Sequence, residues 1–351
     1  MKSTPSEERK PLEAPKKLVL WAYDPFQTEA SLQRVFARAL LQLTKNWSCR
    51  IQPVYVASGF PKQLQKKGLS NESVMEKFHT VGQGVLNALA VRLKFKELAP
   101  LVVIQAKGPE MREQVAALVD YALQEKADLL VAGTRARKGP KRWLLGSFAE
   151  SLSFVSGLPL YFINPSWSVS ADPKKILFPT DFSQESKYAF GRLIGFAKVN
   201  SSRITLFHQV EYPFVTNADL AYGFWPVGYN TLVPDLAIEA KDQADRWIKW
   251  AKKKGVTVTS LIAPKLASGI AESILKAASA GFGMIALAAE SGKVSSALMG
   301  SVTRKIIRGS HCPVWVLRKP KETQEVETAF DITEEEVMSQ LQHTEPLSTS
   351  L

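Results

Sequence analysis

The stretch KILFPTD at residues 175–181 decides the fold, because a related stretch, LVLWAYD, stands at residues 18–24. In both stretches an apolar run as long as a strand ends at an aspartate, Asp24 or Asp181, and a helical pattern follows. Two further pairs keep the same order at a nearly constant offset: LGS at 145–147 with MGS at 299–301, and PLYF at 159–162 with PVWV at 313–316. These matches predict an internal repeat.

The repeat divides the chain into two domains, which we place at residues 16–165 and 174–318. Residues 166–173 are expected to form a linker, residues 1–15 a flexible N-terminal tail, and residues 319–351 an acidic, disordered tail. A chain of 351 residues is long for one compact domain and suits two domains of about 150 residues each.

Short apolar runs alternate with longer amphipathic segments in both copies, a pattern typical of parallel strands joined by crossover helices. The clearest helical patterns cover residues 71–98, with Asn71 as the cap, and residues 236–251. We therefore predict an α/β protein of two tandem, doubly wound domains, each with a five-stranded parallel sheet. The expected strands are 18–21, 51–56, 101–105, 129–132 and 160–163 in the first copy, and 176–178, 204–208, 256–262, 284–288 and 314–317 in the second.

Composition and charge limit the classes of function. The chain has 45 Lys and Arg against 33 Asp and Glu, and its acidic tail leaves the folded part strongly basic, which favours anionic partners. Its 2 cysteines and 4 histidines are scattered, which argues against a disulfide framework and a metal site. The sequence has no apolar window long enough for a membrane span and no signal-peptide pattern, so we expect a cytoplasmic protein without a membrane partner.

A candidate site lies where the strands end, because open parallel sheets bind ligands where the strand order reverses. Asp24 and Asp181 end the first strand of each copy, and the glycine-containing loop 133–147 follows the fourth strand of the first copy. Glycines let a backbone approach a phosphate, and a helix that starts at Gly146-Ser147 would add free N–H groups. The loop also carries five cations: Arg135, Arg137, Lys138, Lys141 and Arg142. It suits an anionic ligand, and a plain strand-to-helix turn is the alternative.

The aspartates and serines have structural interpretations as well. Asp24 and Asp181 can act as turn or capping residues, and Ser147 and Ser301 can act as helix N-caps. The sequence pairs no Ser or Cys nucleophile with a nearby His and acid, so we assign no catalytic residue and disfavour an enzyme.

The quoted motifs resemble the universal stress protein family. The resemblance rests on the strand that ends at an aspartate, on a G-x2-G-x9-G-(S/T) loop and on a closing Cys-Pro-Val strand. Its most specific parts are ILFPTDFS at 176–183 and GSVTRKIIRGSHCPVWVL at 300–317. It implies an adenine nucleotide alpha hydrolase-like fold whose domains pair through the last strand. In this family some members bind ATP and others do not; the aspartate contacts the adenosine end and the glycine loop cradles the phosphates.

Carried over residue by residue, the resemblance implies ATP or a related adenine nucleotide as cofactor, with Mg²⁺ as an optional companion and no nucleotide as the alternative. The implied positions in the first copy are Asp24, Val54, Gly133, Arg135, Ala136, Gly146 and Ser147. Those in the second copy are Pro179, Thr180, Asp181, Gly300, Ser301, Val302 and Thr303.

Each copy departs from the family motif in a different place. In the first, Ala136 replaces the second glycine and Ala22-Tyr23 replaces the usual Pro-Thr. The second copy lacks the first glycine of its loop in either alignment: ungapped counting puts Leu287 and Glu290 at the two glycine positions, and a one-residue deletion puts Ala288 and Ser291 there. The charge of Glu290 opposes phosphate binding unless the side chain turns away or a metal ion bridges it. Because triphosphate charge has to be neutralised, we expect the first copy to be the more competent nucleotide site.

Two functions follow from these observations. One is a stress-response sensor or regulator that binds an adenine nucleotide in at least one copy. The other is an interaction or scaffold protein of the same fold that binds no nucleotide and acts through a protein partner. Nucleic acid is disfavoured because positive charge is its only support. We also expect an intramolecular pseudo-dimer through strands 160–163 and 314–317, with a further homodimer open, and we expect the aromatic stretch 211–236 to fold over the protein.

Overall fold

The computed structural model of the chain describes residues 17–26, 30–59, 70–134, 147–165, 167, 172–210, 229–263, 269–289 and 300–318. The first half contains β1 (Lys17–Ala22), α1 (Ala30–Asn46), β2 (Cys49–Ala57), α3 (Asn71–Leu93), β3 (Val102–Gln105), α4 (Met111–Gln124), β4 (Leu129–Gly133), α5 (Ser147–Val155) and β5 (Leu160–Ile163). The second half contains β6 (Asp172–Pro179), α6 (Gln184–Asn200), β7 (Arg203–Gln209), α8 (Tyr229–Lys253), β8 (Val258–Ala263), α9 (Ile270–Ala278), β9 (Phe282–Ala288), α10 (Ser301–Gly309) and β10 (Val314–Leu317).

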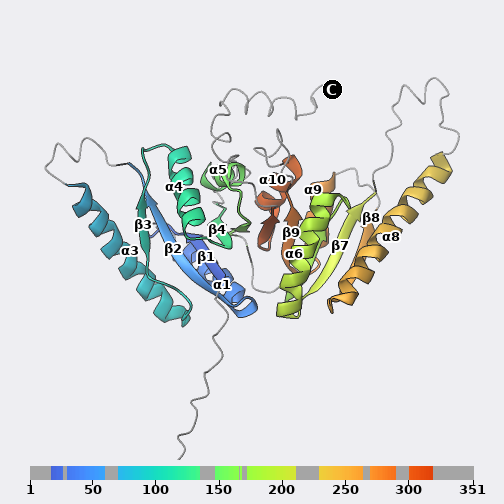
Figure 1. Cartoon of the computed structure of the whole chain (residues 1–351), viewed down its shortest axis with the longest axis horizontal. Helices are drawn as coiled ribbons and strands as arrows, with labels where there is room; N and C mark the ends of the chain where they lie inside the picture. Colours follow the sequence, from blue (N-terminus) through green and yellow to red (C-terminus); the bar gives the residue numbers. More distant parts are fainter. Residues whose placement is uncertain are drawn as a thin grey trace, which may run out of the picture.

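The strands form one ten-stranded sheet in the order β3-β2-β1-β4-β5-β10-β9-β6-β7-β8. Within each half all paired strands are parallel. Right-handed crossovers then place α1 and α3 on one face of the first half and α4 and α5 on the other. Figure 1 shows the two halves as wings on either side of a central seam, where α5 and α10 lie next to each other. The predicted α/β fold with two five-stranded parallel sheets is confirmed.

The helix expected at residues 71–98 begins at Asn71, but its N-cap residue and its C-terminal end differ from the prediction. Its N-cap is Ser70, whose side chain accepts a hydrogen bond from the Ser73 N–H, while the Asn71 amide bonds to the Gln105 side chain. The helix stops at Leu93 because Lys94 adopts a left-handed conformation with φ of 53°. The later apolar residue that extended the pattern, Leu98, instead pairs with Ile51 at the sheet edge.

Strands β5 and β10 join the halves as an antiparallel pair. Tyr161 faces Trp315 in the register, with Phe162 opposite Val314 and Leu160 opposite Val316. All of these side chains are buried, so each strand covers what would otherwise be an exposed apolar edge. The predicted pseudo-dimer through these two strands is confirmed.

Each half also caps a helix of the other half. The Asn164 amide, directly after β5, donates to the Arg308 carbonyl at the end of α10 (3.0 Å). Arg318, directly after β10, donates to the Ser156 carbonyl (2.9 Å) and to the Ser153 carbonyl at the end of α5. Helix ends leave carbonyls without intrahelical partners, so these two side chains satisfy them across the seam.

Aromatic residues pack beside the same seam. The ring centroid of Trp47, after α1, lies 6.0 Å from Phe196 in α6 and 6.0 Å from Trp315 in β10. Phe196 and Trp315 are 4.9 Å apart, so the three rings form one cluster between the halves. Such contacts add to the strand pairing and make the halves one structural unit.

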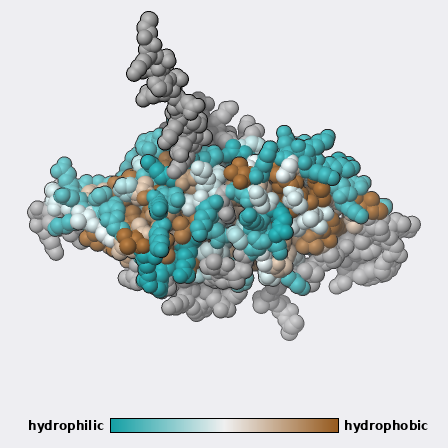
Figure 2. All heavy atoms as spheres, turned by 90° about the horizontal axis from the view of Figure 1, so that it is seen from below, coloured by the Kyte–Doolittle hydropathy of each residue, from teal (hydrophilic) through white to brown (hydrophobic). Residues whose placement is uncertain are grey.

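The surface mixes polar and apolar residues. Exposed apolar side chains such as Val91 and Val199 lie on helices, and Figure 2 shows hydrophobic patches set among hydrophilic ones on the face seen from below. None of the described helices combines the length and the apolar character that a membrane span requires.

Candidate functional site

Both halves have a cavity at the carboxyl ends of their parallel strands. The strand order reverses between β1 and β4 in the first half and between β6 and β9 in the second. Crossovers leave in opposite directions at these points, so a space opens above the sheet, where such folds bind ligands. The cavities differ in size, with volumes of about 170 Å³ in the first half and about 760 Å³ in the second.

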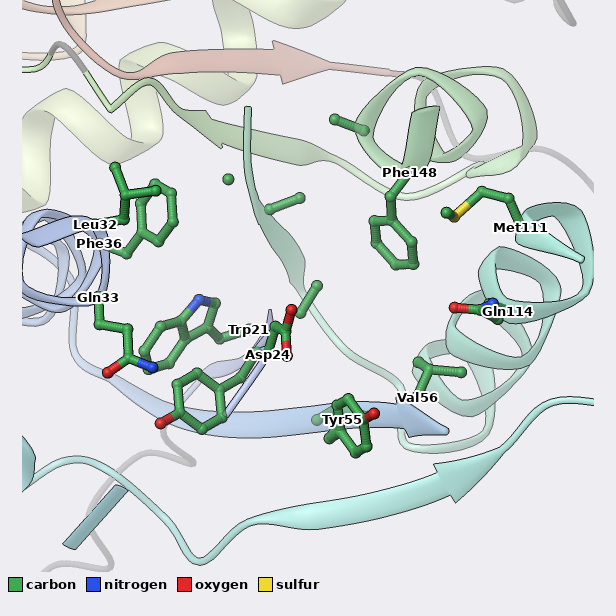
Figure 3. Close-up of a pocket in the computed structure, with 16 residues that line it drawn as sticks. Trp21, Asp24, Leu32, Gln33, Phe36, Tyr55, Val56, Met111, Gln114 and Phe148 are labelled. Carbon is green, nitrogen blue, oxygen red and sulfur yellow. The ribbon is translucent and has the colours of Figure 1, made fainter. Parts of the chain in front are cut away.

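The first-half cavity brings together three predicted site residues, Asp24, Val54 and Gly133. The rest of its lining comes from β1 and β2 and from helices on both faces of the sheet. Its apolar and aromatic side chains include Trp21, Leu32, Phe36, Tyr55, Met111 and Phe148 (Figure 3). Gln33 and Gln114 also line it, so the cavity offers apolar contact together with hydrogen-bonding groups.

Aromatic rings occupy the places where a phosphate would need open backbone. A Cβ atom at Gly133 would overlap the Phe36 ring, so the room that this glycine leaves is filled by α1. Phe148 lines the cavity at the start of α5. Its counterpart in the repeat is Val302, which is smaller. Both rings take up space within this cavity.

Asp24 closes a turn at the end of β1, because its Oδ1 accepts a hydrogen bond from the Phe26 N–H (3.0 Å). Burial, together with the charge of Asp24, raises the pKa of Tyr23 to about 12. The same two causes raise the pKa of Tyr55. Both phenols therefore stay protonated at neutral pH beside a carboxylate.

The second-half cavity collects all the predicted residues of that copy except Ser301: Pro179, Thr180, Asp181, Gly300, Val302 and Thr303. Four more elements complete it, through His208 of β7, Ile270 of α9, Leu287 of β9 and Arg318 after β10. The described lining thus combines apolar side chains with residues that carry carboxylate, hydroxyl and guanidinium groups. Ligand sites in proteins commonly combine these features.

Asp181 is held by the start of α6. Its Oδ1 accepts hydrogen bonds from the Ser183 N–H (2.9 Å) and from the Ser186 hydroxyl (2.7 Å). Burial alone would raise the pKa of this carboxyl, but the hydrogen bonds from Ser186 and Ser183 outweigh it and lower the pKa. The carboxylate is therefore fixed in direction and ionised at neutral pH.

The backbone next to Asp181 is strained. Phe182 has φ of 60°, which is uncommon for a bulky residue, and its ring lies 5.0 Å from that of His208. His208 in turn donates Nδ1–H to the Thr180 carbonyl (2.8 Å). Strain of this kind persists where surrounding contacts impose it, and it is frequent at ligand sites.

Helix α10 begins at the cavity with an open backbone. Its N-cap is Gly300, which provides no side-chain cap, and a Cβ there would meet no atom within 4 Å. Ser301 is the first helical residue and is exposed, so the interpretation of Ser301 as an N-cap is wrong. The first N–H groups of a helix lack intrahelical partners and attract anions.

Several predicted positions lie outside the described residues: Arg135, Ala136, Gly146, Glu290 and the aromatic segment 211–228. Ser147 is the first residue of α5, and its side chain lies outside the described part of the structure. Among the residues that are described, no three His, Cys, Asp or Glu side chains are grouped to hold a metal ion.

The sequence interpretation missed Phe36, His208 and Arg318. The first two carry no local signal, because their roles depend on packing between elements far apart in the chain. For Arg318 a signal existed. PLYFIN at 159–164 aligns with PVWVLR at 313–318, so Arg318 occupies the position of Asn164 in the repeat.

Comparison with known proteins agrees with this geometry. A model of the universal stress protein family matches residues 17–156 and again residues 173–318. Universal stress protein MJ0531 of Methanocaldococcus jannaschii is 30% identical over 153 residues, which cover 42% of this chain and 84% of that protein. Universal stress protein MJ0577 of the same organism is 28% identical over 157 residues, which cover 42% and 95%.

Solved structures match over both halves at once. A universal stress protein from Archaeoglobus fulgidus aligns with a TM-score of 0.59 and 17% identity, over 86% of this chain and 98% of that one. A functionally unknown protein from Pseudomonas aeruginosa aligns with a TM-score of 0.53 and 12% identity, over 90% and 98%. These likenesses show the fold, and the double match of the family model shows the family. The chain therefore belongs to the universal stress protein family and carries the family's domain twice in tandem.

Proposed function

We propose that the chain binds an adenine nucleotide in the second-half cavity and acts as a stress-response sensor or regulator whose conformation depends on that ligand. The observation that carries the proposal is the cavity itself. Its volume of about 760 Å³ falls within the range of roughly 300–1,000 Å³ that small-molecule sites occupy. It also joins the Pro179-Thr180-Asp181 turn to the start of α10.

The lining supplies a group for each part of a nucleotide. Asp181, ionised and fixed by Ser183 and Ser186, can accept hydrogen bonds from the hydroxyl groups of the ribose. Ile270 and Leu287 offer apolar contact to the adenine. The open helix start at Gly300 supplies N–H groups to the phosphates. When bound, the nucleotide would bring negative charge into the site. Its affinity can therefore depend on the number of its phosphates.

This proposal reverses the ranking of the two halves that the sequence suggests. The first-half cavity of about 170 Å³ lies below the usual range for such ligands, and Phe36 occupies the room next to Gly133. For the first half the described residues favour the alternative, a domain that binds no nucleotide and serves as an interaction module.

Calorimetric titration of the full chain with ATP tests the proposal. Gly300→Asp places a carboxylate where the structure leaves open space, and Asp is a favourable N-cap, so the fold should persist while the N–H groups are taken from the phosphates. We expect this change to weaken ATP binding by about 100-fold or more, from the loss of charge-assisted contacts and from repulsion.

Two variants are the matched controls. Gly300→Asn has the same size without the charge and should lose less affinity than Gly300→Asp. Gly146→Asp makes the equivalent change in the first half and should alter the affinity less than about 3-fold, because we place the ligand in the other cavity. Loss confined to Gly146→Asp would move the site to the first half. Absence of binding to the unmodified chain would favour the scaffold function.

A further inference from the structure

Arg318 is a buried cation at the wall of the second-half cavity. Its exposed fraction is 7%, and it is the only Lys or Arg in the described part of the cavity lining. Its two amino groups donate to the Ser153 and Ser156 carbonyls of the first half. Its Nε–H is buried and has no hydrogen-bond partner among the described residues.

Within the described part of the chain, no carboxylate balances the charge of Arg318. The ion pairs formed by described residues do not include Arg318, and burial lowers its pKa to about 10, which still leaves it protonated at neutral pH. The nearby Arg304 and Arg308 differ, because both lie 3.8 Å from Glu150. A buried, unpaired charge destabilises a fold unless another group compensates for it.

The other half shows that the capping role needs no charge. Asn164 occupies the position of Arg318 in the first copy and caps the end of α10 with a neutral amide. Asn164 does not line the described part of the first-half cavity. A guanidinium therefore caps the helix beside the large cavity, whereas a neutral amide is sufficient for the same capping role in the half with the small cavity.

The other charged residues in the described lining of the second-half cavity are acidic. The described lining of the second-half cavity includes the carboxylates of Asp181 and Glu185, which without Arg318 would make it unfavourable for a polyanion. A positive group in a site of low solvent access interacts strongly with a ligand charge. Arg318 is therefore placed to reverse the preference of the cavity.

We infer that Arg318 determines specificity in this cavity through its charge, which favours the anionic, phosphate end of the ligand and so selects nucleoside phosphates over the uncharged nucleoside. The inference rests on the proposed function, since it concerns the same cavity. Arg318 contributes the charge, and the start of α10 contributes neutral N–H groups to the same cavity. Its two bonds to α5 carbonyls hold the guanidinium in place before the ligand arrives.

The test compares ATP, ADP and adenosine as ligands of the full chain by calorimetry. Arg318→Asn copies the first half and Arg318→Gln keeps a longer amide that can reach the same carbonyls, so at least one neutral variant should fold, as thermal unfolding will show. We expect both to bind ATP and ADP about 10- to 100-fold more weakly and adenosine less than about 3-fold more weakly. Arg318→Lys should recover much of the ATP affinity because it restores the charge.

Asn164→Ala is the matched control for damage to the seam. It removes the equivalent cap in the other half, so it should lower the melting temperature but leave the ratio of ATP to adenosine affinity unchanged. Equal loss of ATP and adenosine in the neutral Arg318 variants, or no loss, would overturn the inference while leaving nucleotide binding intact. If the unmodified chain binds none of the three ligands, the proposed function fails and the inference fails with it.

Discussion

Asp181 shows how one residue can stabilise the fold and prepare a site. Two hydrogen bonds to its Oδ1 come from the first turn of α6, and they make the ionised form the stable one. The turn role expected for this aspartate is therefore present, and it leaves the carboxylate at the cavity wall. A capping residue and a ligand-binding residue need not be alternatives here.

The lowered pKa of Asp181 has a consequence for acid stability. Because the folded-state pKa lies below the unfolded value of about 3.9, the carboxylate stabilises the fold above that pH. The contribution disappears as the pH falls through the folded-state pKa. Asp181→Asn keeps an acceptor oxygen but cannot titrate. We predict that between about pH 5 and pH 2 the free energy of unfolding falls more steeply in the unmodified chain than in the variant.

Urea unfolding at a series of pH values measures both curves. Parallel curves for the two proteins would show that the hydrogen bonds to Asp181 do not favour its ionised form. The variant should also match the unmodified chain near neutral pH to within the loss of one charge-assisted bond, roughly 1.5–3 kcal/mol, which separates a titration effect from general damage.

At the residue scale the sequence predicted which positions meet at the second cavity but not how each is used. Gly300 and Asp181 could be placed because a strand end and a helix start converge in this fold. The N-cap at Gly300, rather than Ser301, depends on a backbone conformation that the letters do not reveal. Phe36 fills the first cavity through a contact with Gly133 that only packing determines.

At the scale of helices, two C-terminal ends show the same left-handed backbone conformation, once at a lysine and once at a glycine. After α3, Lys94 takes φ of 53° and its N–H bonds to the Ala90 and Val91 carbonyls. After α8, Gly255 takes φ of 80°, and a Cβ added there would meet no atom within 4 Å. The left-handed conformation is costly for residues with a Cβ and easy for glycine.

Exchanging the residue types should therefore change stability in opposite directions. We predict that Lys94→Gly raises the free energy of unfolding by about 0.5–1 kcal/mol, and that Gly255→Ala lowers it by about 1 kcal/mol. Equilibrium unfolding in urea measures both changes. Changes of the same sign in the two variants would show that contacts, and not backbone strain, dominate at these helix ends.

The bounds of elements could be predicted where the pattern is short and flanked by turn residues. Strands β5 and β10 occur at the expected residues, each just after a proline, Pro159 or Pro313. Helix α3 ends earlier than expected, because the apolar Leu98 continued the helical pattern although it belongs to the sheet edge. Hydrophobic periodicity alone does not show whether a leucine such as Leu98 continues the helix or belongs to the sheet edge.

For the whole molecule, the repeat, the apolar last strands and the resemblance to a family whose domains pair through that strand together predicted the pseudo-dimer. Two copies of a domain with an apolar last strand have one economical way to cover it, and β5 pairs with β10 accordingly. The unequal cavities could not be foreseen from the motifs. They depend on side-chain packing in each copy, such as the Phe36 ring against Gly133 and Phe148 at the position of Val302.

The two halves thus place one large cavity and one small, partly filled cavity on a single sheet. The copies exchange helix caps across the seam, and Arg318 belongs both to the second cavity and to the contacts that hold α5 of the first half. In the proposed function, a nucleotide in the second cavity would therefore lie beside a residue that also contacts α5 of the first half.

Photolabelling of the full chain with 8-azido-ATP, followed by tryptic digestion and mass spectrometry, locates the nucleotide most directly. Cleavage after Lys175 and Lys187 releases residues 176–187, which contain Asp181, and cleavage after Lys17 and Arg34 releases residues 18–34, which contain Asp24. The account predicts label that excess ATP suppresses on the peptides of the second-half cavity, which are 266–276 with Ile270, 277–293 with Leu287 and 176–187, and little label on peptide 18–34. Suppressible label on peptide 18–34 alone, or no label that ATP suppresses, would contradict it.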